Sequence, residues 1–129
     1  MNKSQSSVEF MIVVAAGFFI LVVFLIVLQS NILDKTKEKI NLEMNQVAIT
    51  VQNEINLATS ASNGYKRTFI LPSVVGGMNY TLNISGNILQ ISTTNGNFAL
   101  GVSVLPVQGN IKKDSNIIRN QNGTVFLNE

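Results

Sequence analysis

The chain of 129 residues contains no cysteine, no histidine and no tryptophan. Without cysteine, disulfide bonds and thiolate metal sites are excluded. Without histidine, the chain lacks both the commonest general base and the commonest transition-metal ligand. We therefore expect no enzyme, no metal site and no cofactor.

Charged residues are also scarce, at 12% of the chain against roughly 25% in an average soluble domain. The formal net charge is +2, and the basic residues are scattered along the sequence. A nucleic-acid-binding protein usually gathers Lys and Arg on one face, where they neutralise several phosphates. No nucleic-acid partner is therefore expected. From Tyr65 onward the only acidic residues are Asp114 and the terminal Glu129, so we expect no catalytic carboxylate pair and no metal cluster in this region.

The hydrophobic residues are concentrated in an uninterrupted apolar segment, Phe10 to Leu28. As an α-helix this segment would span about 28 Å, close to the ~30 Å hydrocarbon core of a bilayer. A secretory signal peptide has a shorter apolar core, of about 7–15 residues, followed by a small-residue cleavage site. Here the next residues are Gln29-Ser30-Asn31, without an Ala-x-Ala pattern. The apolar segment is therefore predicted to be retained rather than removed after Leu28.

An acidic residue, Glu9, stands directly before the apolar segment. An ordinary membrane anchor favours Lys or Arg at its cytoplasmic edge. If the chain began at Gln5, the new α-amine would lie four residues from Glu9. In a packed bundle of such helices a buried carboxylate needs a cation or hydrogen bonds, and the amine of a neighbouring subunit could supply them. The alternative is that Glu9 is only a tolerated acid at a membrane interface.

The stretch Lys3-Ser4-Gln5-Ser6-Ser7-Val8-Glu9-Phe10 and the apolar segment after it resemble the class III signal peptide of archaeal type IV pilin-like proteins. Precursors in that family carry a short basic leader, a cleavage site just before Gln, a small residue at the third mature position and Glu-Phe or Glu-Tyr at the fifth and sixth. The resemblance covers residues 3–28. The family often has Gly where this chain has Ser4, and the leader here has one basic side chain, Lys3.

This resemblance implies cleavage between Ser4 and Gln5 and a subunit that polymerises with copies of itself through its N-terminal helix. Gln5, Glu9 and Phe10 would then set the register between subunits. The implied partners are a prepilin peptidase, an assembly ATPase and its membrane platform protein. Lys3 would keep the leader in the cytoplasm. The implied location is the cell membrane for the precursor and an extracellular pilus at the cell surface for the mature subunit.

A helical pattern continues beyond the apolar segment, because no Pro or Gly occurs between Ser30 and Asn63. Apolar residues recur at Ile32, Leu33, Ile40, Met44, Val47, Val51, Ile55 and Ala58, and the later spacings of 4, 3, 4, 4 and 3 trace one helix face. This pattern predicts an amphipathic helix over residues 29–64. One continuous helix from about Ser6 to Ser62 and two helices separated at Gln29-Ser30-Asn31 both fit the pattern, and the continuous helix suits a pilin better.

From residue 65 the pattern changes to short strands and turns. We predict strands over residues 67–71, 80–85, 88–93, 98–104, 116–119 and 124–127. Gly86-Asn87 and Asn122-Gly123 are two-residue hairpin signals. We expect an antiparallel meander of roughly four to six strands packed on the amphipathic helix, because a lone sheet of this size is marginally stable. The expected fold is α+β and pilin-like, divided into leader 1–4, apolar helix 5–28, amphipathic helix 29–64 and β domain 65–129.

Within the predicted β domain, residues 65–129, three Asn-x-Ser/Thr sequons begin at Asn79, Asn83 and Asn122. They are candidate N-glycosylation sites if this region is extracellular. Asn79 and Asn122 fall near predicted turns, which suits access for a glycan. Asn83 lies in the middle of a predicted strand and suits it less well.

The leading functional prediction is a structural pilin, major or minor. The alternatives are a bitopic membrane-anchored surface protein that presents a small β domain as a binding module, and an accessory pseudopilin. Gln5 and Glu9 discriminate between them, since a plain anchor needs neither residue. Adhesion and other pilus roles share one scaffold, so the fold class does not choose among them.

Overall fold

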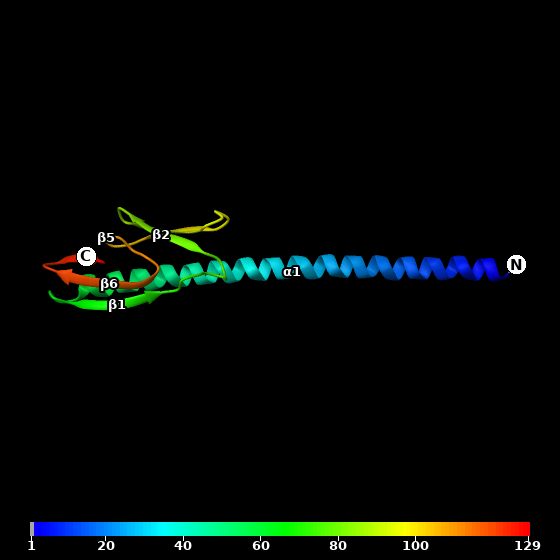
Figure 1. Cartoon of the computed structure of the whole chain (residues 1–129), viewed down its shortest axis with the longest axis horizontal. Coiled ribbons are helices and arrows are strands. Elements are labelled where there is room, and N and C mark those ends of the chain that lie inside the picture. Colours follow the sequence, from blue (N-terminus) through cyan, green and yellow to red (C-terminus); the bar gives the residue numbers. More distant parts are fainter. Residues whose placement is uncertain (1) are drawn as a thin grey trace. The chain divides into compact units, whose positions relative to one another are not determined.

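A computed structural model describes residues 2–129, with side chains from residue 3 onward. It contains one helix and seven strands over these residues (Figure 1). The helix, α1, runs from Asn2 to Ser60. The strands are β1 (Lys66–Leu71), β2 (Tyr80–Ser85), β3 (Ile88–Thr93), β4 (Ala99–Ser103), β5 (Gln108–Gly109), β6 (Asp114–Gln121) and β7 (Thr124–Leu127). The chain divides into two compact units, Met1–Glu38 and Lys39–Glu129, and residues of α1 belong to both.

Helix α1 passes through Gln29-Ser30-Asn31 without a break, so the prediction of one continuous helix is confirmed. It begins at Asn2, before the predicted start at Ser6, because the short polar residues of the leader include no Pro or Gly to stop it. It ends at Ser60, and Gly64 reverses the chain with a φ of 90°. The side-chain amide of Asn120 donates to the carbonyl oxygen of Ala58 at 2.8 Å, which satisfies a backbone acceptor of the last turn.

The strands form two sheets rather than the single antiparallel meander predicted from the sequence. One sheet has the order β1-β6-β7-β5 and the other the order β2-β3-β4. All pairs are antiparallel except β5 with β7, which is parallel. The prediction missed β5 because this strand is only two residues long. It missed the division into two sheets because β1 pairs with β6, which lies far along the chain. Hydrophobic periodicity reports local structure and does not reveal such distant pairing.

Both predicted two-residue hairpins are confirmed. Ser85 lies opposite Ile88 across the β2–β3 turn, and Gln121 lies opposite Thr124 across the β6–β7 turn. Asn122 and Gly123 have φ angles of 54° and 80°, as a type I′ turn requires at its two central residues. This turn matches the twist of the flanking strands and brings the β6–β7 hairpin close to the loop that follows α1.

The hydrophobic core of the second unit is built on one face of α1. The predicted apolar stripe is buried from Ile40 onward, whereas Ile32 and Leu33 are exposed and belong to the first unit. Both sheets contact this helix: the Gln52 side chain donates to the carbonyl oxygen of Ser103 on β4 at 2.7 Å, and Glu54 pairs with an arginine on β1. The α+β fold, a long N-terminal helix packed on C-terminal β-sheets, is therefore confirmed and is consistent with a pilin-like arrangement.

Candidate functional site

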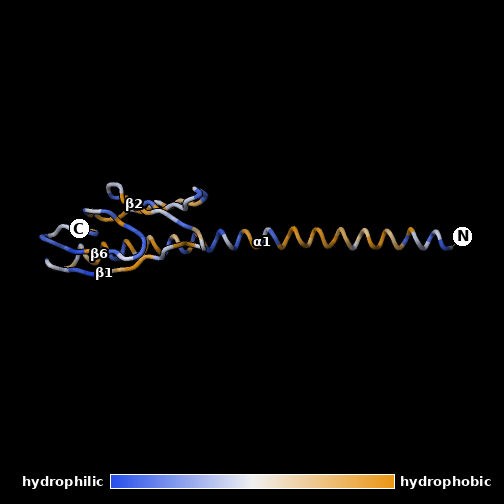
Figure 2. The backbone as a smooth tube through the Cα atoms, in the orientation of Figure 1, coloured by the Kyte–Doolittle hydropathy of each residue, from blue (hydrophilic) through white to orange (hydrophobic). Residues whose placement is uncertain are grey.

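The apolar segment, residues 10–28 of α1, is not covered by any described part of the chain. Each of its large hydrophobic side chains is between 39% and 70% exposed. Figure 2 shows this part of α1 as hydrophobic on both visible sides. A helix that is apolar around its whole circumference is normally buried in a protein core or in a membrane. By length and composition α1 could cross a membrane, and the apolar segment needs cover from lipid or from other protein surfaces.

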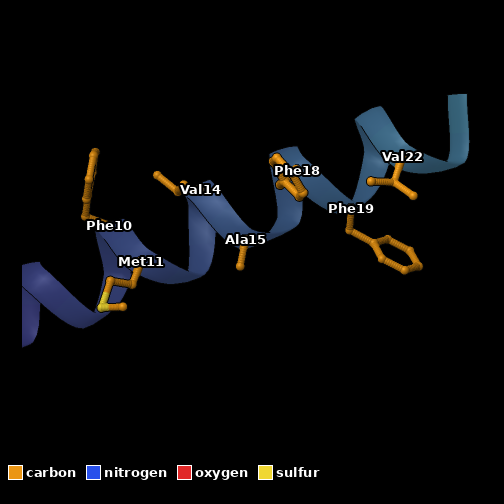
Figure 3. Close-up of a pocket in the computed structure, with 7 residues that line it drawn as sticks. All are labelled: Phe10, Met11, Val14, Ala15, Phe18, Phe19 and Val22. Carbon is orange, nitrogen blue, oxygen red and sulfur yellow. The ribbon is translucent and has the colours of Figure 1, made fainter. Parts of the chain in front are cut away.

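One face of the apolar segment carries a groove of about 560 Å³. Phe10, Val14 and Phe18, spaced four residues apart, point to one side, and Met11 and Phe19 point to the other (Figure 3). Ala15 lies between Met11 and Phe19, and its small side chain leaves the space that forms the groove. Rows of side chains at a spacing of four residues, with gaps between them, are the surface features through which helices interlock. The groove is therefore suited to receive side chains of another helix.

The predicted processing and register residues lie in the first turns of α1. Lys3, Ser4, Gln5 and Glu9 are all exposed. Gln5 and Glu9 are four residues apart and so share one face of the helix. Within residues 3–129 the ion pairs are Lys39–Glu43 and Arg67–Glu54, so the Glu9 carboxylate is not consumed by an ion pair with a described side chain. Glu9 is open to a cation from outside the chain.

The predicted cleavage position, between Ser4 and Gln5, lies inside α1. The exposure of both residues gives a peptidase access to their side chains. The helical backbone at this position would have to open locally for cleavage, and the ends of helices open most readily.

All three sequon asparagines are exposed, as is the hydroxyl residue two positions after each. Asn79 directly precedes β2, Asn83 lies within β2, and Asn122 is in the β6–β7 turn. The side chain of Asn122 accepts a hydrogen bond from the Asn63 amide at 3.2 Å. The side chains of Asn79 and Asn83 do not make this contact with Asn63. All three asparagine side chains are exposed and therefore accessible to a modifying enzyme.

Sequence reasoning missed several buried polar residues in the second unit. Asn116 is fully buried, and its side chain accepts from the backbone N–H of Lys112 at 3.0 Å and donates to the Lys112 carbonyl at 2.7 Å. Asn116 and Asn120 alternate with Ile118 on the inner face of β6. Strand periodicity could have placed these asparagines inside, but it does not say which backbone groups they would satisfy.

Tyr80 is another buried polar residue that the sequence did not single out. Its hydroxyl donates a hydrogen bond to the carbonyl oxygen of Pro72. Burial, and secondarily the negative charge of Asp114, raises the pKa of Tyr80 to about 12. Tyr80 therefore ties β2 to the end of the β1 segment and does so in its neutral form.

The chemistry of the N-terminal region thus consists of an accessible acid, Glu9, at the start of an uncovered apolar helix with a grooved face. Such a region is suited to assembly or anchoring. No family model, curated protein or solved structure matches this chain.

Proposed function

We propose that this chain is the structural subunit of an archaeal type IV pilus-like surface filament. The subunit is made as a membrane-inserted precursor, is cleaved between Ser4 and Gln5 by a prepilin peptidase, and polymerises through its N-terminal helix. An assembly ATPase and its membrane platform protein drive the polymerisation. The C-terminal β domain lies outside the cell.

The observation that carries this proposal is the uncovered apolar segment. Its large side chains are exposed on every side, although α1 continues into a second half that is well packed on the β domain. Each Å² of apolar surface that is removed from water stabilises the buried state of the helix by roughly 25 cal/mol. Before assembly, lipid covers the apolar segment. In a filament, neighbouring copies of the same helix cover it. The groove around Ala15 gives those copies a surface into which a ridge of side chains fits.

Glu9 supports a filament subunit over a plain membrane anchor. An anchor gains nothing from a carboxylate at this position. In a helix bundle the same carboxylate is withdrawn from water, and a buried charge is tolerated only with a partner of opposite sign or several hydrogen bonds. The α-amine that cleavage creates at Gln5 of a neighbouring subunit has the required charge. The pairing favours the axial offset that brings the two groups together.

The test is the intact mass and N-terminal sequence of the protein recovered from filaments sheared from the cell surface. A chain that starts at Gln5, lacking residues 1–4, is the expected result. A chain that starts at Met1 and stays in the membrane fraction would overturn the proposal and leave a bitopic anchor that presents the β domain as a binding module. A processed chain that is absent from sheared filaments would assign it to the pseudopilins.

A further inference from the structure

A polar hollow of about 350 Å³ lies where the loop after α1 meets the β6–β7 turn. Its lining includes two cationic residues, Lys66 and Arg119, and four amide residues, Asn63, Asn120, Gln121 and Asn122. This polar hollow is made entirely by the second unit of the chain and takes no part in the assembly role of the apolar segment.

The walls of the polar hollow are held in place by hydrogen bonds between the loop and β6. The backbone N–H of Gly64 donates to the Asn120 carbonyl at 3.0 Å, and the Asn120 N–H donates to the Tyr65 carbonyl at 2.9 Å. At the rim, the N–H of Asn122 donates to the side-chain oxygen of Asn63 at 2.9 Å. These bonds organise the site before any ligand arrives, which lowers the entropy lost on binding.

Arg119 is one of the two cations of this site. The pairing register places it opposite Lys66 on β1 and opposite Phe126 on β7. Its guanidinium carbon lies 5.3 Å from the centre of the Phe126 ring, a distance at which a cation is attracted to an aromatic face. Its Nε is buried and has no hydrogen-bond partner among the described residues. Stacking on the Phe126 ring orients the guanidinium plane of Arg119. The N–H group at Nε of Arg119 donates no hydrogen bond to a described residue.

The two cations of the polar hollow are not neutralised within the described chain. Neither ion pair found over residues 3–129 includes Lys66 or Arg119. No carboxylate is among the described residues that line the hollow. Arg119 and Lys66 are register partners on neighbouring strands and line the same hollow, and Arg and Lys side chains both bind oxyanions such as carboxylate or sulfate. The positive potential of the site therefore selects for a negatively charged ligand.

We propose that the polar hollow binds an acidic sugar residue of a surface or extracellular polysaccharide. Arg119 and Lys66 hold its carboxylate or sulfate group, and the amides of Asn63 and Gln121 hydrogen-bond its hydroxyl groups, since each amide both donates and accepts. Two cations in one hollow suit a single oxyanion. A nucleic acid would require a row of cations along several phosphates.

The test measures binding of the full-length protein, in detergent micelles, to four immobilised probes. These are a polygalacturonate oligosaccharide, a sulfated dextran, neutral dextran and single-stranded DNA. We expect binding to at least one of the two acidic glycans, and the one that binds identifies the oxyanion as carboxylate or sulfate. Binding to neutral dextran and to DNA should be at least about tenfold weaker, because charged hydrogen bonds and sugar hydroxyls are both required.

Variants separate this site from general electrostatic attraction. Arg119→Gln and Lys66→Gln should each weaken glycan binding about tenfold or more. Arg119→Lys should also weaken it, because the charge remains but the planar fork is lost. The matched control is Lys112→Gln, which removes one exposed positive charge outside the polar hollow and should change binding less than about twofold.

Three results would overturn the proposal: no binding of the unsubstituted protein to either acidic glycan, equal loss of binding in Lys112→Gln and Lys66→Gln, or DNA binding as strong as glycan binding. Melting temperatures establish that each variant is folded. If Arg119→Gln fails to fold, Lys66→Gln decides the outcome, because the Lys66 side chain is exposed.

Discussion

Glu54 on α1 and Arg67 on β1 form an ion pair whose two side chains differ greatly in exposure. Arg67 Nε lies 3.6 Å from Glu54 Oε2, and the side chains are 52% and 10% exposed, respectively. Glu54 Oε2 has no hydrogen-bond partner among the described residues. The arginine is therefore the compensation for a carboxylate that the fold has withdrawn from water.

Replacing Arg67 by Met should lower the free energy of unfolding by about 1–3 kcal/mol, because the buried carboxylate is left without a cation while the aliphatic packing is largely kept. Denaturant unfolding of the full chain in micelles measures this change. The control is Lys39→Met, which breaks the 3.9 Å pair with Glu43, in which both side chains are well exposed. That change should alter stability by less than about 0.5 kcal/mol. Equal effects of the two variants would contradict the argument.

Two neighbouring glycines allow backbone strain to be separated from steric overlap. Gly76 and Gly77 have φ angles of 54° and 75°, so alanine is strained at either position. A Cβ at Gly76 would lie 2.3 Å from Cγ1 of Ile40 on α1, whereas a Cβ at Gly77 would meet no atom within 4 Å. The close approach at Gly76 is also where its backbone N–H donates to the carboxylate of Glu43.

Gly77→Ala should therefore destabilise by about 1 kcal/mol, the strain of a left-handed residue. Gly76→Ala should destabilise by about 1–3 kcal/mol more, because Ile40 or the loop has to move. Thermal unfolding of the two variants under identical conditions measures the difference. Equal losses of stability would show that the loop relaxes away from α1 without penalty.

Stability at high pH should depend on the Tyr80 hydroxyl. Burial and the charge of Asp114 raise its pKa from an ordinary value of 10.0 to about 12. The folded state therefore binds this proton more tightly than the unfolded state does. The resulting stabilisation is complete below pH 10 and is lost as the pH rises through 12.

The variant Tyr80→Phe lacks this titration and also loses the hydrogen bond to Pro72. Below pH 10 it should be less stable than the unsubstituted chain by about 1 kcal/mol. The difference should shrink and then change sign as the pH rises from 10 to 12, because ionisation of Tyr80 costs the unsubstituted chain more stability than the hydrogen bond supplies. Unfolding measured at intervals of pH in this range gives the difference. A constant difference over the whole range would show that Tyr80 ionises equally readily in both states.

The sequence predicted local structure well because local structure follows from short-range rules. The spacing of Met44, Val47 and Val51 identified the buried face of α1. The Asn122-Gly123 pair identified a hairpin because Asn and Gly readily adopt the positive φ angles that its turn requires, and both residues have them in the structure. The pairing of Lys66 with Arg119 could not be predicted in this way. It depends on how segments distant in sequence meet after the helix and hairpins have formed.

The same limit applies to the sites. Glu9 could be singled out because its unusual feature is local: it is an acidic residue directly before an uncharged apolar segment. The polar hollow could not, since its cations come from two strands and its rim from the loop after α1. Glu54 has no local signal either: its burial follows from the position of β1, and only the structure shows the arginine that compensates for it.

The assembly role proposed for Glu9 can be tested by substitution. Glu9→Ala and Glu9→Gln should leave membrane insertion unchanged, because the apolar segment that drives insertion is intact. Both should reduce the amount of filament by at least about tenfold, since the α-amine of Gln5 in a neighbouring subunit would be buried without a counter-charge. The control is Glu38→Gln, which removes an exposed carboxylate of α1 outside the apolar segment and should assemble normally. Immunoblots of sheared-filament and membrane fractions give the ratio. Normal filaments from Glu9→Ala would remove the register role from Glu9, whereas accumulation of processed subunit in the membrane would show that Glu9 acts after cleavage, at the step where subunits join.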